Sequence, residues 1–88
     1  MNYEEFKDHI ARAREEGACL EALEAMEAAS SFEEFCQHPQ APEWLFWYAF
    51  YVLESPFPAG EAAIVENGFY LKTYILKFPE RGDALSKL

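Results

Sequence analysis

The sequence predicts an all-α fold, a compact bundle of five to seven short helices whose C-terminal half is a degenerate helical repeat. Three observations predict it. Apolar residues recur at helical spacing, capping residues precede several of these segments, and glycine or proline separates them. The chain has 88 residues, of which 51% are hydrophobic and 17% aromatic, enough for one small core. We therefore expect a single domain over residues 1–88.

The first helix is predicted between Asn2 and Gly17. Asn2 and Glu5 have the spacing of a capping box, and glycine is typical of the position after a helix C-terminus. The apolar residues of this segment share one helical face, and most of its charged residues point the other way. The apolar face consists of Tyr3, Phe6, Ile10 and Ala13.

Two more helices are predicted before Pro39. Residues 18–29 are rich in alanine, leucine and glutamate, which are strong helix formers. Their apolar face consists of Cys19, Ala22, Leu23, Met26 and Ala29. Ser31 and Glu34 repeat the capping spacing and begin a short helix over residues 32–38. Residues 1–38 are thus expected to form acidic amphipathic helices.

Residues 42–88 are expected to form an aromatic helical repeat. Pro42 suits the first turn of a helix over residues 42–54. The aromatic residues of this segment would also suit a strand, but the proline start, the length and the helical neighbours favour a helix. Because the segment is apolar around its whole circumference, we expect it to be central.

Two short helices are predicted after this segment, over residues 58–65 and 69–78. Asn67 and Gly68 are expected to end the first of them, because both residue types are common at helix C-termini. Pro79 follows the second helix, and the chain closes in a turn that contains Leu85 and Leu88.

A weak internal repeat runs through this half of the chain. A set of aromatic and aliphatic residues recurs twenty-three positions later, as Phe46-Trp47 with Tyr51-Val52-Leu53 and then Phe69-Tyr70 with Tyr74-Ile75-Leu76. Phe57-Pro58 recurs as Phe78-Pro79 after a shortening by two residues. Stacked helical units of this kind share a continuous core. Two units cannot stand alone, so we expect the N-terminal helices to cap them.

One run of residues from this half carries a recognisable motif. It comprises His38-Pro39-Gln40-Ala41-Pro42-Glu43-Trp44, Trp47-Tyr48-Ala49, Val52-Leu53 and Phe57-Pro58-Ala59-Gly60-Glu61-Ala62-Ala63-Ile64. The run resembles a short repeat of uncharacterised bacteriophage and prophage proteins, approximately WYAxxVIxxxFPxGEAAI. The similarity is good over residues 38–66 and poor over 67–83. It implies a helical repeat in a viral or mobile-element setting, and it implies no activity.

Charge is the strongest compositional feature. Sixteen acidic residues against seven basic ones give a net charge of −9. Residues 1–44 hold eleven acids and three bases, whereas residues 45–88 hold five and four. A negative field of this size repels phosphate backbones, so we expect no direct nucleic-acid binding. A partner with a basic surface is expected instead.

Seven glutamates are the candidate partner-binding residues: Glu15, Glu16, Glu21, Glu24, Glu27, Glu33 and Glu34. The commoner interpretation of such residues is a solvated helix surface. The alternative is that their carboxylates mimic phosphates and occupy a basic nucleic-acid channel on a host protein. The phage resemblance favours this alternative, because phages gain by blocking nucleic-acid-guided defences. The expected function is therefore that of a non-enzymatic, anti-CRISPR-like inhibitor of a host complex.

Aromatic residues supply a second candidate surface, formed by Trp44, Tyr48 and Tyr51. Most aromatic side chains in so short a chain belong to the core. One or two are expected at the surface, where tryptophan and tyrosine often anchor protein interfaces. This gives an alternative function, a structural or homo-oligomeric module such as a homodimer, with no inhibitory role.

Catalytic, metal and cofactor sites are not expected. The soft metal ligands His9, His38, Cys19 and Cys36 do not have the usual zinc spacing, and no phosphate loop or oxyanion loop accompanies them. We expect both cysteines to be small core residues. The N-terminus lacks the pattern of a signal peptide, and the longest apolar run has ten residues. A cytoplasmic protein with reduced thiols is expected, in the host cell if a phage encodes it, with no membrane partner.

Overall fold

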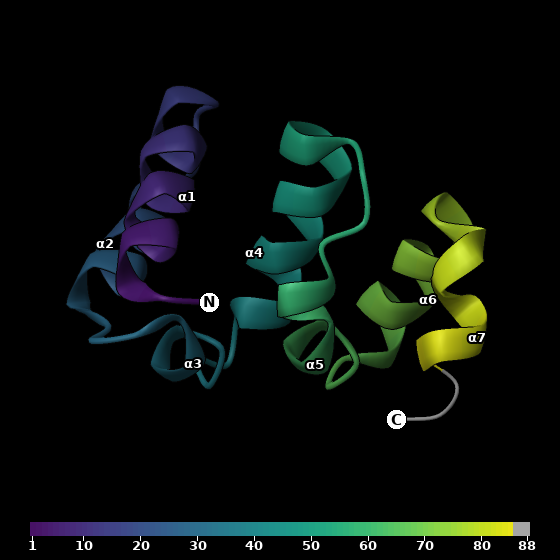
Figure 1. Ribbon diagram of the computed structural model, residues 1–88. Coiled ribbons are helices and arrows are strands. Elements are labelled where there is room, and N and C mark those ends of the chain that lie inside the picture. The colour runs from purple at the N-terminus through teal and green to yellow at the C-terminus, as the bar shows by residue number, and fades with distance from the viewer. Residues whose placement is uncertain (86–88) are drawn as a thin grey trace. The chain divides into compact units, whose positions relative to one another are not determined.

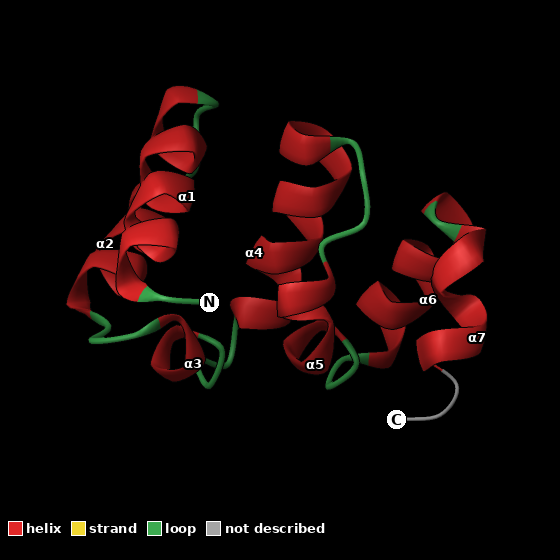
Figure 2. Cartoon of the chain, in the orientation of Figure 1, coloured by secondary structure: helices red, strands yellow, loops and turns green. Residues whose placement is uncertain are grey.

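The computed structural model describes residues 1–85, and every regular element in that range is helical (Figures 1 and 2). The all-α prediction is confirmed, and the described residues contain seven α-helices joined by short 3₁₀ and π segments. Contacts divide the chain into unit 1, Met1–Pro39, and unit 2, which begins at Gln40. The boundary falls where the acidic helices give way to the aromatic repeat. The predicted residue Leu88 lies outside the described range.

Unit 1 contains α1 (Tyr3–Glu15), α2 (Leu20–Ala28) and α3 (Phe32–Phe35). The predicted capping box at the start of α1 is present. The Asn2 side chain accepts a hydrogen bond from the Glu5 backbone N–H at 2.8 Å, and the Glu5 carboxylate accepts one from the Asn2 N–H. These bonds satisfy donors that the first helical turn leaves without a partner.

Gly17 turns the chain from α1 into α2. Its φ of +87° is left-handed, a region that glycine adopts without a steric penalty. The Ala18 N–H bonds to the Ala13 carbonyl at 3.0 Å, and the Gly17 N–H bonds to the Arg14 carbonyl at 3.2 Å. This pair of bonds is the Schellman motif, which lets α2 run back alongside α1 (Figure 1).

The core of unit 1 forms around Phe6. Its ring meets Phe32 edge-on, with centroids 5.6 Å apart, and lies 6.0 Å from Phe35. Ile10 and Ala13, on the same face of α1, are also buried. Burying a phenylalanine ring stabilises a fold by roughly 1.5–3 kcal/mol, so this cluster is a major source of stability for unit 1.

Two expected core residues of unit 1 are exposed instead. Tyr3 lies in the first turn of α1, and the Lys7 ammonium lies over the Tyr3 ring, 5.7 Å from the ring centroid. Cys19 is the N-cap of α2 and has extended backbone angles, so its side chain does not follow the helical face that the periodicity assigned to it. The expectation of a core thiol at Cys19 was therefore wrong.

Unit 2 is built around one continuous helical stretch. It begins as α4 (Ala41–Trp47) and widens into the π-helix η1 (Tyr48–Leu53), and Glu54 ends it in a left-handed conformation with φ of +51°. Contacts join α4 to both α5 (Glu61–Ile64) and α6 (Gly68–Lys77). The predicted helix and its central place within this unit are thus observed, whereas its π-helical second half was not predicted.

The internal repeat is visible in backbone geometry. Phe57 and Phe78 have nearly the same φ and ψ, −125° and 77° against −125° and 72°. Each precedes a 3₁₀ turn, η2 (Pro58–Gly60) or η3 (Pro79–Arg81). A four-residue helix follows each turn, α5 in the first copy and α7 (Gly82–Leu85) in the second.

Each copy also buries its phenylalanine against the edge of a tyrosine ring. Phe57 meets the ring of Tyr48 edge-on with centroids 5.5 Å apart, and Phe78 meets Tyr74 edge-on at 5.1 Å. All four rings are buried. Each proline-led turn therefore follows a phenylalanine that packs edge-on against a buried tyrosine, but the two tyrosines stand at different positions of the repeat, since Tyr74 corresponds to the exposed Tyr51.

Asn67 begins a helix instead of ending one. Its side-chain oxygen accepts hydrogen bonds from the backbone N–H groups of Phe69 and Tyr70, at 3.0 and 3.3 Å. Gly68 is the first residue of α6. Asparagine suits both helix ends, and here the two N–H donors of α6 decide which end it caps.

Within the described residues, no helix has both the length and the apolar character that crossing a membrane requires.

Two glycines provide a matched test of backbone strain. A Cβ added at Gly17 or at Gly68 would meet no atom within 4 Å, but only Gly17 has a left-handed φ. Gly17→Ala is expected to lower the free energy of unfolding by about 1 kcal/mol. Gly68→Ala is expected to leave it unchanged or raise it by up to about 1 kcal/mol. Denaturant unfolding measures both; equal losses would contradict the role assigned to the Gly17 turn.

Candidate functional site

All seven predicted glutamates are exposed. They lie at the C-terminal end of α1, along α2 and in the first turn of α3. They form two groups, according to whether the carboxylate has a hydrogen-bond or ion-pair partner within unit 1.

Three of the seven glutamates have partners in unit 1. Glu27 forms an ion pair with Arg14. Glu34 accepts a hydrogen bond from the Ser30 hydroxyl at 2.6 Å, and Glu33 lies 3.7 Å from the N-terminal ammonium. These carboxylates contribute to local structure, so part of their charge is compensated within the unit.

The other four glutamates flank the Gly17 turn. Glu15 and Glu16 end α1, and Glu21 and Glu24 lie on α2. No side-chain hydrogen bond or ion pair joins the carboxylates of these four to any described residue. We call them the acidic cluster.

Two members of the acidic cluster are placed unfavourably with respect to their helix dipole, whereas Glu21 lies in the first turn of α2, where the dipole favours a carboxylate. Glu15 and Glu16 stand at the C-terminal end of a helix, where the helix dipole disfavours negative charge. The carboxylates also repel one another, because dissolved salt screens exposed charges effectively only beyond the Debye length of about 8–10 Å. A basic partner surface would relieve both effects. The acidic cluster therefore has the electrostatic character of a site for cations on another macromolecule.

The three predicted aromatic residues have different surroundings. Tyr51 is 63% exposed, whereas Trp44 is half-buried. Tyr48 is only 5% exposed because its ring packs against Phe57. Tyr48 thus belongs to the core of unit 2, which corrects the expectation that it contributes to an exposed surface. Whether Trp44 or Tyr51 contacts a partner stays a prediction.

Sequence reasoning missed a continuous surface of rings. Consecutive centroids lie 4.7 to 5.6 Å apart along this series, which we call the aromatic strip: Tyr51, Phe50, Phe46, Tyr70 and Phe69. Every member is half-buried or exposed. The repeat offset pairs Phe46 with Phe69, but the contact between the two copies through Tyr70 depends on how α4 and α6 pack. Aromatic residues are enriched at protein interfaces.

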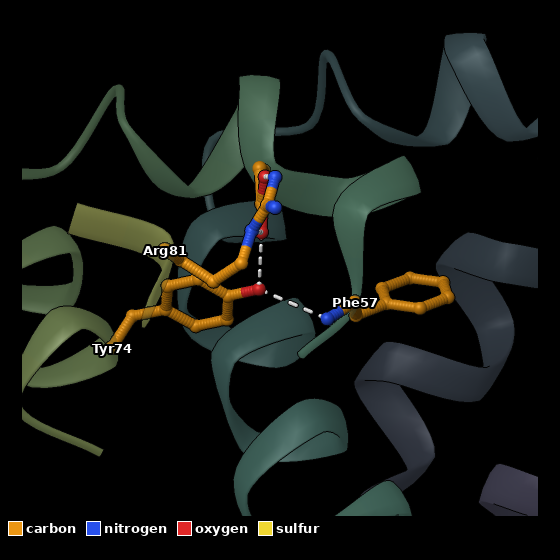
Figure 3. Close-up of polar contacts among 4 residues, drawn as sticks. Phe57, Tyr74 and Arg81 are labelled. Carbon is orange, nitrogen blue, oxygen red and sulfur yellow. Dashed lines mark hydrogen bonds and ion pairs between the residues drawn. The ribbon is translucent and has the colours of Figure 1, made fainter. Parts of the chain in front are cut away.

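One buried polar network links the two copies of the repeat (Figure 3). The carboxylate of Glu61, on α5, is 5% exposed and accepts two hydrogen bonds from the Arg81 guanidinium, at 2.7 and 2.8 Å. The Tyr74 hydroxyl donates to the same carboxylate at 2.6 Å and accepts from the Phe57 backbone N–H at 2.9 Å. Figure 3 shows this hydroxyl between the Phe57 nitrogen and the carboxylate that Arg81 holds.

The network keeps Glu61 ionised. The hydrogen bonds from Arg81 hold the pKa of Glu61 below its ordinary value, and the Tyr74 hydroxyl acts in the same direction although burial opposes both. Burial raises the pKa of Tyr74, and its bond to Glu61 adds to that shift. Both carboxylate oxygens and the hydroxyl are thus engaged with protein groups. We assign the network a structural role, because its bonds join Glu61 on α5 to Tyr74 on α6 and to Arg81 in the turn before α7.

The thiols and imidazoles do not gather. Burial raises the pKa of Cys36 to about 11, so its thiol is protonated at neutral pH. Burial, together with the charge of Arg12, lowers the pKa of His9. In the described part of the chain, no group of three or more His, Cys, Asp or Glu side chains is arranged to hold a metal ion.

The Tyr74 hydroxyl can be tested against a neighbouring tyrosine. Tyr74→Phe removes a hydrogen bond to a buried carboxylate and leaves the Phe57 N–H without its acceptor. We expect the free energy of unfolding to fall by about 2 kcal/mol. Tyr70→Phe, on the same helix, removes the hydroxyl of a half-buried tyrosine and is expected to cost less than about 0.5 kcal/mol. Similar losses in the two variants would show that the Tyr74 hydroxyl is not a structural link.

The ionisation of Glu61 predicts a pH dependence. A carboxyl group whose pKa is lowered in the folded state stabilises the fold above its unfolded pKa, and this contribution disappears as the pH falls through the folded value. Wild type is therefore expected to exceed Glu61→Gln in stability at pH 7, by about 2 kcal/mol. The difference should shrink as the pH falls below 4.5, the ordinary pKa of this group. Denaturant unfolding of both proteins from pH 7 to pH 3 measures it, and a constant difference would refute the assignment.

The chain was compared with known proteins. No protein-family model matches it. No curated protein and no solved structure gives a match either.

Proposed function

We propose that this chain is a non-enzymatic protein-binding module that contacts a basic surface on its partner through the acidic cluster. The observation that carries the proposal is the set of four exposed, unpaired glutamates around the Gly17 turn. No side-chain hydrogen bond or ion pair to a described residue engages their carboxylates. A partner that supplies lysine or arginine side chains would satisfy them.

The partner class follows from the chemistry of carboxylates. Several carboxylates on two helices in contact resemble a phosphate backbone in charge, and proteins that bind nucleic acids offer the matching basic channel. The resemblance of residues 38–66 to a phage repeat supports a setting in which such a channel is a target. We therefore propose inhibition of a nucleic-acid-binding host complex as the specific activity.

The affinity of such a contact depends on salt. Exposed ion pairs weaken as ionic strength rises, because the Debye length shortens from about 10 Å at 0.1 M to about 3 Å at 1 M. Electrostatic steering also raises the association rate at low salt. Binding through the acidic cluster is thus distinguishable from binding through the aromatic strip, whose apolar contacts strengthen or persist in high salt.

Charge reversal tests the proposal. The immobilised chain is exposed to a bacterial lysate at low and high salt, and retained proteins are identified by mass spectrometry. Wild type should retain a basic nucleic-acid-binding protein at low salt and release it at high salt. The reversed variant should bind that protein at least about tenfold more weakly, since several attractive pairs become repulsive. This variant carries four substitutions: Glu15→Lys, Glu16→Lys, Glu21→Lys and Glu24→Lys.

A matched control changes the net charge equally but in unit 2. It carries the exposed-residue substitutions Glu43→Lys, Glu54→Lys, Glu66→Lys and Glu80→Lys. The control variant should retain the partner. In a separate measurement, addition of the wild-type chain should lower the affinity of the captured protein for nucleic acid. Equal loss in both variants would indicate a dependence on net charge alone and would refute a contact at the acidic cluster. Circular dichroism checks that every variant is folded.

A further inference from the structure

The second copy of the repeat in unit 2 exposes large apolar side chains on α6. In the first copy, Phe46 is half-buried, and its ring lies 5.6 Å from Tyr70 of the second copy. The equivalent residue of the second copy, twenty-three positions later, is Phe69, and it is 70% exposed. Leu76, which corresponds to Leu53, is 72% exposed. Among the described residues, no third helical copy follows to cover them.

Phe69 and Leu76 lie on one face of α6, together with the positively charged side chains of two lysines. Phe69 and Leu76 are seven residues apart and so lie on the same side of the helix. Lys72 lies between them in sequence, and Lys77 follows; both are exposed. The Lys77 ammonium stands 4.7 Å from the centroid of Phe50. We call Phe69, Lys72, Leu76 and Lys77 the α6 face.

The α6 face carries charge opposite to that of the chain as a whole. The third described cation of unit 2, Arg81, is engaged by Glu61, so the exposed positive charge of this unit is concentrated at Lys72 and Lys77. The chain has a net charge of −9. The partner that suits this face is a helix that presents an apolar side chain together with carboxylates.

Helix α2 has this composition. Leu20 is 71% exposed, and Glu24 follows it at a spacing of four residues, which places both on one side of the helix. Glu21 is three residues before Glu24 and so borders the same side. Glu21 and Glu24 have no partner among the described residues. With nine residues in α2 and ten in α6, the helices are about 13 and 15 Å long, at a rise of about 1.5 Å per residue.

We propose that the α6 face binds α2 of a second copy of this chain. Leu20 would cover Phe69 and Leu76, and Glu21 and Glu24 would pair with Lys72 and Lys77. Two copies related by a two-fold axis make this contact twice, which closes the assembly as a dimer. The inference shares α2 with the proposed function, so an external basic partner and a second copy compete for Glu21 and Glu24.

The contact is tested by sedimentation velocity with two charge-reversed variants. One variant reverses the α6 face, Lys72→Glu with Lys77→Glu, and the other reverses α2, Glu21→Lys with Glu24→Lys. Wild type is expected to dimerise in the micromolar range and to dissociate at high salt. Each variant alone should dimerise at least about tenfold more weakly, because both of its contacts pair like charges.

Mixing the variants gives the decisive measurement. In a mixed dimer one contact has its charges exchanged and the other is native, so both are attractive, and dimerisation should return. The chain with all four substitutions should dimerise as well, which also shows that the lysine substitutions do not prevent folding. A wild-type monomer throughout the micromolar range would overturn the proposal. A wild-type dimer that the reversals do not weaken, or that mixing does not restore, would overturn it equally.

The same variants separate this inference from the proposed function. Lys72→Glu with Lys77→Glu leaves Glu15, Glu16, Glu21 and Glu24 unchanged, so it should still retain a basic partner from the lysate. A chain that loses the dimer but keeps the partner supports both proposals. A monomeric wild type that retains the partner overturns the dimer alone, and a dimer that retains no basic partner overturns the proposed function alone.

Discussion

The second half of this chain depends on the ion pair between Glu61 and Arg81. Neither of the four-residue helices α5 and α7 is long enough to be stable alone, since helix nucleation costs more than one turn returns. The bidentate pair joins the start of α5 to the turn that precedes α7, and Tyr74 ties α6 to the same carboxylate. A buried carboxylate is tolerated here because every hydrogen-bonding requirement is met. Together these bonds hold α5, α6 and the turn before α7 against one another.

The two units differ in what they leave exposed. Unit 1 buries a small phenylalanine cluster around Phe6 and presents carboxylates to solvent. Unit 2 buries two phenylalanine–tyrosine pairs and presents aromatic rings, with two lysines on α6 among several exposed carboxylates. A protein that acts by binding can use both kinds of surface, because apolar contacts supply affinity and charges supply specificity and association rate.

Local sequence patterns predicted those parts of the fold that local physics determines. The capping roles of Asn2 and Ser31 follow from side-chain hydrogen bonds within three residues, and both are observed. The same reasoning misassigned Asn67, because an asparagine caps either end of a helix and only the neighbouring N–H donors decide. The candidate site shows the same limit. The exposure of the seven glutamates agrees with the predicted helix faces, whereas the ion pair between Glu27 and Arg14 requires α1 and α2 to be placed side by side.

By itself, the sequence determined the helical class, the division between an acidic and an aromatic half, and the repeat of the Phe-Pro turns. These features follow from residue spacing, composition and backbone preference, all of which act over a few residues. Only the tertiary structure decided that Tyr48 is buried while Tyr51 is exposed, and that Glu61 meets Arg81 across twenty positions. Such choices depend on which residues from distant segments fill the same space, and periodicity along one helix carries no information about its neighbours.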